Sequence, residues 1–201
     1  MPDDKLARTR EFFAARAAGW EVKFPDDEPA FAQAVLELAP RRGGTALDAA
    51  CGTGRALPFL RDAVGSAGTV LGVDITPEML NEAVLRDRHT VANLILGDVA
   101  TLPFRDASVD VVLGAGLLPH FIDPLAGLSE LARVTRPGGT LGLFHPISRA
   151  ALAARHGGEP DPDDIRAEPA IRQLLARTGW ATRSVDDGPA RYLVIASRRS
   201  Q

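Results

Sequence analysis

The 201-residue sequence predicts a single α/β domain, a doubly wound fold whose mostly parallel sheet carries helices on both faces. Three observations indicate this fold. Short apolar strands alternate with amphipathic helices along most of the chain, as expected for a parallel sheet. A glycine-rich turn at 51–54 joins the first strand to a helix. Two strands follow each other at the C-terminal end, joined by Gly188 and Pro189, which predicts a closing hairpin and an antiparallel edge.

The first 40 residues are expected to form a helical N-terminal cap. Apolar residues recur with helical spacing over 5–18, and Gly19 follows as a typical helix stop. A second helix is predicted over 29–39. Both helices precede the first strand, so this cap, 1–40, stands outside the alternating part of the chain.

Strands and helices alternate from residue 45 onward. The expected strands are 45–50, 68–74, 92–98, 108–116, 140–146, 181–187 and 190–198. The expected helices are about 55–64, 76–88, 124–135 and 167–179. Thr76 followed by Pro77 is a strong helix-start signal, because threonine caps helices and proline fits the first helical position. An irregular polar stretch, 148–164, follows the fifth strand.

Composition and charge are typical of a globular domain and argue against several other classes of protein. The apolar fraction of 45% and charged fraction of 24% are typical of globular domains. A net charge of −3 argues against a general nucleic-acid or anionic-membrane surface. With Cys51 as the single cysteine, no intramolecular disulfide can form. The N-terminal residues lack the apolar segment of a signal peptide and no apolar run reaches membrane-spanning length, so we expect a cytoplasmic protein.

Acidic residues and glycines gather where predicted strands end. Asp48 ends the first strand, Gly52 and Gly54 form the turn after it, Asp74 ends the second strand and Asp98 the third. Ligands of doubly wound sheets bind beyond the carboxyl ends of the strands. These residues therefore predict a cofactor site.

Two cofactors compete for this site. A dinucleotide site wants a third glycine three residues after Gly54, where Leu57 stands, and Asp48 would face the pyrophosphate. S-adenosylmethionine has no phosphate but carries an ammonium group, a sulfonium and a ribose diol. Asp48 suits the ammonium group, the glycine turn lets the backbone approach the methionine portion, and Asp74 suits the ribose hydroxyls. Asp98 suits the adenine amino group, so the sequence favours S-adenosylmethionine.

Five segments in order carry a family resemblance. They are LDAACGTG, VLGVD, GDVATLPF, SVDVVLGAGLLPHF and LARVTRPGGTLGLF. Together they resemble the class I S-adenosylmethionine-dependent methyltransferases, in the small-molecule, ubiquinone-biosynthesis-like branch. The resemblance is dense over 45–145, the expected cofactor-binding core. It implies a Rossmann-like methyltransferase fold with a seven-stranded sheet, strand order 3-2-1-4-5-7-6 and an antiparallel last strand.

The resemblance also implies a role for individual residues. The methionine end of the cofactor would be contacted by Asp48, Gly52, Gly54 and Gly114. The ribose and adenine would be contacted by Asp74, Ile75, Asp98 and Val99. One departure is Ala50, where the family most often has glycine. Its methyl group is expected to constrain the turn mildly without abolishing binding.

Two histidines and two segments are assigned to the methyl acceptor. His120 follows the fourth strand and His145 ends the fifth, so both are expected to face the acceptor. Each could act as a base or shape the pocket, and we favour pocket shaping because a sulfonium donor lowers the need for a base. The acceptor-side loop is 146–166. The amphipathic segment 1–24 is expected to form a mobile lid.

The resulting hypothesis is an S-adenosylmethionine-dependent methyltransferase that methylates an unidentified small molecule by in-line displacement. A non-catalytic S-adenosylmethionine-binding protein stays an alternative, and a nicotinamide-dependent oxidoreductase is less favoured. The segment after the fourth strand lacks the Asn/Asp-Pro-Pro-Tyr/Phe motif of nucleic-acid amino-methyltransferases, so no nucleic-acid partner is expected. No common metal-ligand pattern occurs. A monomer or homodimer without a membrane partner is expected.

Overall fold

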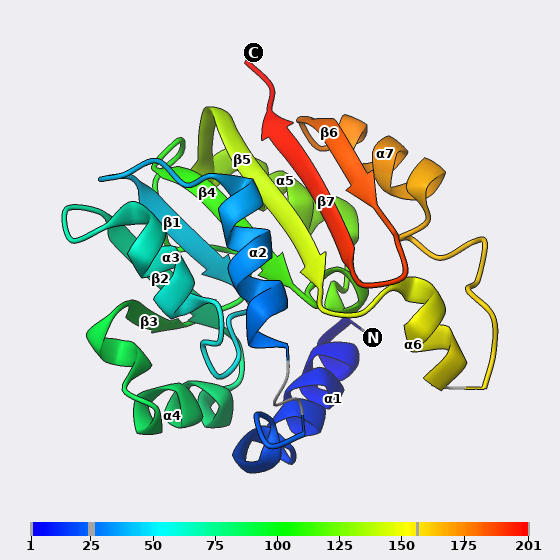
Figure 1. Ribbon diagram of the computed structural model, residues 1–201, viewed down its shortest axis with the longest axis horizontal. Helices are drawn as coiled ribbons and strands as arrows, with labels where there is room; N and C mark the ends of the chain where they lie inside the picture. The colour runs from blue at the N-terminus through cyan, green and yellow to red at the C-terminus, as the bar shows by residue number, and fades with distance from the viewer. Residues whose placement is uncertain (1, 24–26, 156, 201) are drawn as a thin grey trace.

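The computed structural model describes residues 2–23, 27–155 and 157–200. The predicted cap, lid and acceptor-side loop include residues that lie outside this described part, namely 1, 24–26 and 156. Residue 201 is outside it as well. The described chain forms a central sheet with helices packed on both faces (Figure 1).

The sheet has seven strands in the order β3-β2-β1-β4-β5-β7-β6. They are β1 (Thr45–Ala49), β2 (Thr69–Asp74), β3 (Asn93–Leu96), β4 (Val109–Ala115), β5 (Thr135–His145), β6 (Trp180–Asp186) and β7 (Tyr192–Arg198). The pairs among β1 to β5 are parallel, whereas β7 is antiparallel to both β5 and β6. The predicted doubly wound sheet with an antiparallel last strand is thus confirmed. Because β7 lies between β5 and β6, the antiparallel strand is internal and β6 forms the edge.

Helices cover the two faces of the sheet. Those of the described chain are α1 (Pro2–Ala14), α2 (Glu28–Leu38), α3 (Leu57–Val64), α4 (Pro77–Leu85), α5 (Pro124–Val134), α6 (Arg149–Arg155) and α7 (Glu168–Arg177). Three short 3-10 helices are η1 (Ala17–Gly19), η2 (Arg88–Thr90) and η3 (Leu118–His120). One buried apolar cluster packs α2 and α3 on the sheet, and another packs α5 and α7 on the opposite face. The core therefore has two layers of side chains with the sheet between them.

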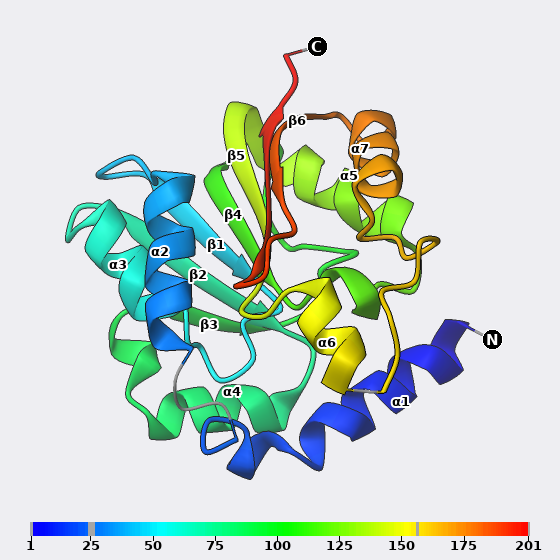
Figure 2. The same cartoon turned by 45° about the vertical axis from the view of Figure 1, so that its right-hand side comes forward.

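The strand order reverses between β1 and β4, which lie side by side. In open α/β sheets this switch point opens a crevice at the carboxyl ends of the strands. In both views, α1 and α6 lie beyond the carboxyl ends of β4 and β5 (Figures 1 and 2). The fold therefore places both segments next to the crevice in which a ligand of this fold class binds.

Two helical segments differ from the sequence prediction. The first helix ends at Ala14, and Gly19 ends the separate 3-10 turn η1. The stretch 148–164, expected to be irregular, contains α6. Its sequence, RAALAAR, is rich in strong helix formers, and the Ser148 hydroxyl accepts a hydrogen bond from the Ala151 amide at 3.0 Å. Serine capping and alanine content therefore outweigh the polar character of this stretch.

Candidate cofactor and acceptor site

Asp48 lies on β1 at the switch point and is 1% exposed. Its Oδ1 atom has no hydrogen-bond partner in the described part of the chain. Burial, together with the neighbouring carboxylate of Asp74, raises the pKa of Asp48 from 3.8 to about 8. A buried carboxyl group without a partner is costly unless a ligand supplies a positive charge or hydrogen-bond donor. The end of β1 is therefore suited to a cationic group.

The glycine loop, residues 50–54, turns sharply between β1 and α3. Ala50, Gly52 and Gly54 have positive φ angles of 62°, 56° and 82°. Gly54 has a left-handed φ that side chains rarely adopt, and a Cβ atom there would lie 2.8 Å from Cδ1 of Leu57, the first residue of α3. Ala50 adopts the left-handed region despite its methyl group, at a cost of about 1–2 kcal/mol. The loop is therefore strained at Ala50, a position where the chain departs from the pattern of the family that it resembles.

Asp74 at the end of β2 fastens the glycine loop to the start of α4. Its Oδ2 accepts a hydrogen bond from the Gly52 amide and its Oδ1 accepts one from the Thr76 amide, both at 2.8 Å. Burial raises the pKa of Asp74, although both amide hydrogen bonds oppose that rise. A carboxylate has about four lone-pair sites, so capacity remains for further donors. Ile75, next to it, is half-buried.

Asp98 and Val99, which are expected at the adenine together with Ile75, differ in their surroundings. Asp98 is half-buried, and its Oδ1 accepts a hydrogen bond from the Ala100 amide at 2.8 Å. Val99 is 7% exposed and belongs to the apolar cluster on the α5 side of the sheet. The carboxylate of Asp98 is thus accessible, whereas the Val99 side chain belongs to the core.

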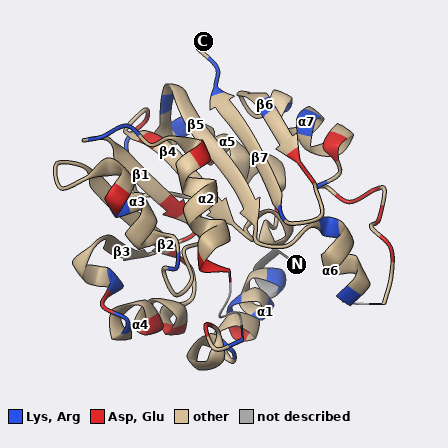
Figure 3. Ribbon diagram, in the orientation of Figure 1, with Lys and Arg blue, Asp and Glu red and all other residues tan. Residues whose placement is uncertain are grey.

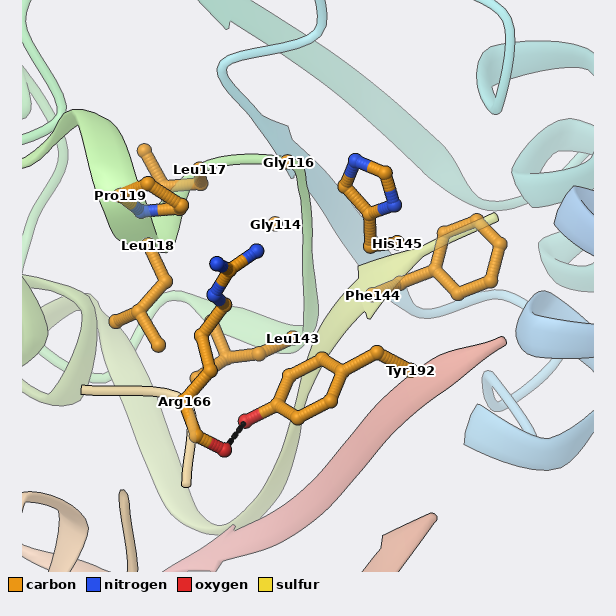
Figure 4. A pocket seen from close by; sticks show the side chains of 10 residues that line it. All are labelled: Gly114, Gly116, Leu117, Leu118, Pro119, Leu143, Phe144, His145, Arg166 and Tyr192. Carbon is orange, nitrogen blue, oxygen red and sulfur yellow. Dashed lines mark hydrogen bonds between the residues drawn. The ribbon is translucent and has the colours of Figure 1, made fainter. Parts of the chain in front are cut away.

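A small pocket lies beside the ends of β4 and β5. It is lined by Gly114, Gly116, Leu117, Leu118, Pro119, Leu143, Phe144, His145, Arg166 and Tyr192. Its free space is about 10 Å³, close to that of one water molecule. A Cβ atom at Gly114 would lie 2.9 Å from Cδ2 of Leu117, so this glycine lets the segment after β4 fold back over the strand. In Figure 4 the Arg166 side chain reaches into the middle of these residues.

The two histidines lie at this end of the molecule, as their positions after β4 and β5 predict. The His120 ring packs edge-on against Phe13 of α1, with 4.9 Å between centroids. Partial burial is the largest cause that lowers the pKa of His120, and the charges of Lys5 and Arg166 add to it. The residue as a whole remains exposed to solvent. Burial lowers the pKa of His145, opposed by a backbone hydrogen bond to Ile147. Both rings are therefore mostly neutral at pH 7.

The N-terminal cap is tied to the glycine loop by polar contacts that the sequence did not indicate. The Thr53 hydroxyl donates to Oε1 of Glu21 at 2.8 Å, and the same carboxylate pairs with Arg86 of the α4 end at 3.2 Å. On the far side of residues 24–26, Asp27 pairs with Arg55, whose Nη1 lies 2.9 Å from Oδ2. The sequence shows oppositely charged residues in the cap and after the glycine loop, but charge alone does not indicate which of them pair.

The acceptor-side segment contributes Arg166, also absent from the sequence-based site. Its guanidinium binds the Asp164 carboxylate through Nε at 3.0 Å and through one terminal nitrogen at 2.5 Å. The Tyr192 hydroxyl donates to the Arg166 carbonyl at 2.9 Å, shown as the dashed line in Figure 4. Tyr192 is paired with His145 across β5 and β7. The sheet thus holds Tyr192 and His145 side by side at the end of β5 that lines the pocket.

Comparisons with known proteins agree with this geometry. A family model described as "Methyltransferase domain" matches residues 47–143. The chain is 41% identical over 110 residues to a demethylmenaquinone methyltransferase of Staphylococcus saprophyticus, covering 53% of this chain and 46% of that protein. It is 35% identical over 140 residues to a malonyl-[acyl-carrier protein] O-methyltransferase of Pectobacterium atrosepticum, covering 69% and 53%. The chain spans about a third to a half of the length of the first curated relatives it matches.

A solved structure supports the same assignment. An S-adenosylmethionine-dependent methyltransferase of Aquifex aeolicus superposes with a TM-score of 0.68 at 26% identity, over 85% of this chain and 88% of that chain. Residues 47–143 thus resemble a methyltransferase domain, and the solved structure that the chain resembles is an S-adenosylmethionine-dependent methyltransferase. In the part of the chain that the structure describes, no helix is long and apolar enough to cross a membrane.

Proposed function

We propose that this protein transfers the methyl group of S-adenosylmethionine to a small-molecule acceptor. The observation that carries this proposal is the buried Oδ1 atom of Asp48, which has no partner in the described chain and lies beside the glycine loop. A buried acid at this point suits the ammonium group of the cofactor. It opposes a pyrophosphate, so it disfavours the nicotinamide alternative.

The described residues fit the remaining parts of the cofactor. Asp74 offers oxygen acceptors to the ribose hydroxyls at the end of β2, and Asp98 offers one to the adenine amino group. The left-handed turn at Gly52 and Gly54 brings backbone amides close to the methionine portion. Ile75 and Val99 would border the adenine, Val99 through its backbone, and Gly114 would lie under the methionine portion.

The bound cofactor supplies a methyl group that its sulfonium already activates. Asp48, the glycine turn and Asp74 would hold this cofactor, which would supply the methyl group to a lone pair of the acceptor. The protein then mainly has to align the acceptor, which can supply about 7–11 kcal/mol of the barrier. We assign the binding core to 45–145, the cap to 1–40 and acceptor contacts to 146–166, with His120 and His145 shaping the pocket.

Calorimetry and product analysis test this function. Titration with S-adenosylmethionine, S-adenosylhomocysteine and NAD should show binding of the first two and none of NAD. A screen of small-molecule acceptors, with products detected by mass, should then show a gain of one methyl group. NAD binding would overturn the cofactor assignment, and cofactor binding without any methylated product would favour the non-catalytic alternative.

A further inference from the structure

Arg166 gives the acceptor pocket a charge that the apolar residues around it do not explain. Its side chain is 17% exposed and reaches among Gly114, Leu118 and Leu143 (Figure 4). Asp164 engages Nε and one terminal nitrogen of the guanidinium. The other terminal nitrogen, Nη1, has no hydrogen bond within the described residues, so the fork retains donors for a ligand.

Two cations share the carboxylate of Asp164. Arg149 on α6 approaches Asp164 at 3.8 Å and pairs with Asp187 at 3.0 Å. The Arg149 side chain is 9% exposed, so it is a fixed part of the rim. Asp187 pairs with Arg149 and Asp164 is shared by both arginines, and this network of four charges holds the guanidinium of Arg166 in place.

Further cations surround the same rim. Lys5 of α1 donates from Nζ to the Phe121 carbonyl at 2.9 Å, directly after η3. Arg155 ends α6, and basic residues mark α1 and both ends of α6 in Figure 3. The charges of Lys5, Arg155 and Arg166 act on His120 and His145 and lower their pKa values, whereas the carboxylates of Asp164 and Asp187 act on Tyr192 in the same pocket lining. Cations therefore face the histidine side of the pocket.

We propose that the methyl acceptor is a small anion whose carboxylate, ionised phenol or ionised enol binds Arg166, with an apolar body against Leu118 and Leu143. This inference rests on the proposed function and names its substrate class. A planar guanidinium recognises an oxyanion through paired hydrogen bonds, which gives direction as well as charge. The free space of about 10 Å³ requires that the segments covering the pocket move apart when the acceptor enters.

The test compares benzoate with benzamide, which match in shape and differ in charge. Both are titrated into isotopically labelled protein saturated with S-adenosylhomocysteine, and the amide signals of Gly114, Gly116 and Leu118 are followed by NMR. Benzoate is expected to shift these signals and to bind at least ~10-fold more tightly than benzamide, as a charge-assisted hydrogen bond predicts. Equal binding, or no shift of these amides with either ligand, would overturn the proposal.

Three variants distinguish the effect of the Arg166 charge on benzoate binding from the effect of removing any arginine. Arg166→Gln should remove the preference for benzoate, while Arg166→Lys, which retains the charge, should keep part of it. Arg172→Gln is the matched control, because Arg172 pairs with Glu168 on the exposed face of α7. An unchanged benzoate preference in Arg166→Gln would contradict the assignment.

Calorimetry with S-adenosylhomocysteine distinguishes the two hypotheses. All three variants are expected to bind it as the wild type does, because Arg166 and Arg172 lie outside the proposed cofactor contacts. Failure of the wild type to bind it would refute the proposed function. Normal cofactor binding without a preference for benzoate would refute the anionic acceptor alone.

Discussion

Asp48 is expected to release a proton when the cofactor's ammonium group binds. In the ligand-free protein, burial and Asp74 raise the pKa of Asp48 to about 8, so the carboxyl group is mostly protonated at pH 7. An adjacent ammonium group favours the ionised form and lowers this pKa. Ionising the group costs about 1.4 kcal/mol for each pH unit below its pKa. The affinity for S-adenosylmethionine should therefore rise about tenfold per pH unit between pH 6 and 8 and level off above.

Calorimetry in two buffers with different ionisation enthalpies measures this proton directly. At pH 7 the binding enthalpy should differ between the buffers by the amount expected for release of about one proton. Asp48→Asn should weaken binding and abolish both the pH dependence and the buffer dependence. The same substitution at the exposed Asp62 is the control and should leave both unchanged. Equal affinity at pH 6 and pH 8 would refute the reasoning.

The same carboxyl group makes the stability of the ligand-free protein depend on pH. Its folded pKa of about 8 lies above the ordinary value of 3.8, so the folded chain binds this proton more tightly than the unfolded chain. The resulting stability is fully present below pH 4 and is lost as the pH rises to about 8, by about 1.4 kcal/mol per unit. At pH 7 the free energy of unfolding of Asp48→Asn, measured by urea denaturation, should therefore be about 4 kcal/mol higher than that of the wild type. A difference in the free energy of unfolding between Asp48→Asn and wild type that stays constant from pH 5 to 8 would contradict this linkage.

The sheet and the acids at its strand ends could be predicted because both leave local signals. Each central strand is a short apolar run, and a carboxylate stands at or near the end of the run, as Asp48 and Asp74 do. Strand–helix alternation then fixes which ends of the strands meet. The strand order came from the family resemblance, since the sequence alone predicted only a hairpin for the last pair. The start of α4 at Pro77 was also predicted.

Long-range polar contacts could not be predicted, because each partner looks ordinary in its own segment. Thr76 illustrates this even over a short distance. Its sequence position predicts a capping hydroxyl, yet the Thr76 side chain makes no capping hydrogen bond to α4, and Asp74 accepts the Thr76 amide instead. Arg166 reaches its position through Asp164 and through Tyr192, 26 residues further along. No periodicity or motif connects these residues before the chain has folded.

Three further predictions test the site. Asp74→Ala should weaken S-adenosylmethionine binding by about 1.5–3 kcal/mol in calorimetry while the protein stays folded, since hydrogen bonds to a charged group are lost; unchanged affinity would refute the ribose role, and Asp74→Asn should lie in between. Hydrogen exchange should show that residues 2–23 gain protection when the cofactor binds, because Glu21 contacts Thr53 of the glycine loop; equal protection would mean that the segment is permanently packed and not a lid. Finally, His120→Ala and His145→Ala should raise the acceptor KM with a similar kcat and leave cofactor affinity nearly unchanged. Burial and the cations of the rim keep both pKa values below 6.5, so both rings are already neutral at pH 7, and the wild-type rate should be insensitive to their titration from pH 7 upward. A kcat about 10²–10⁴-fold lower at unchanged KM would instead identify that histidine as the base and contradict pocket shaping.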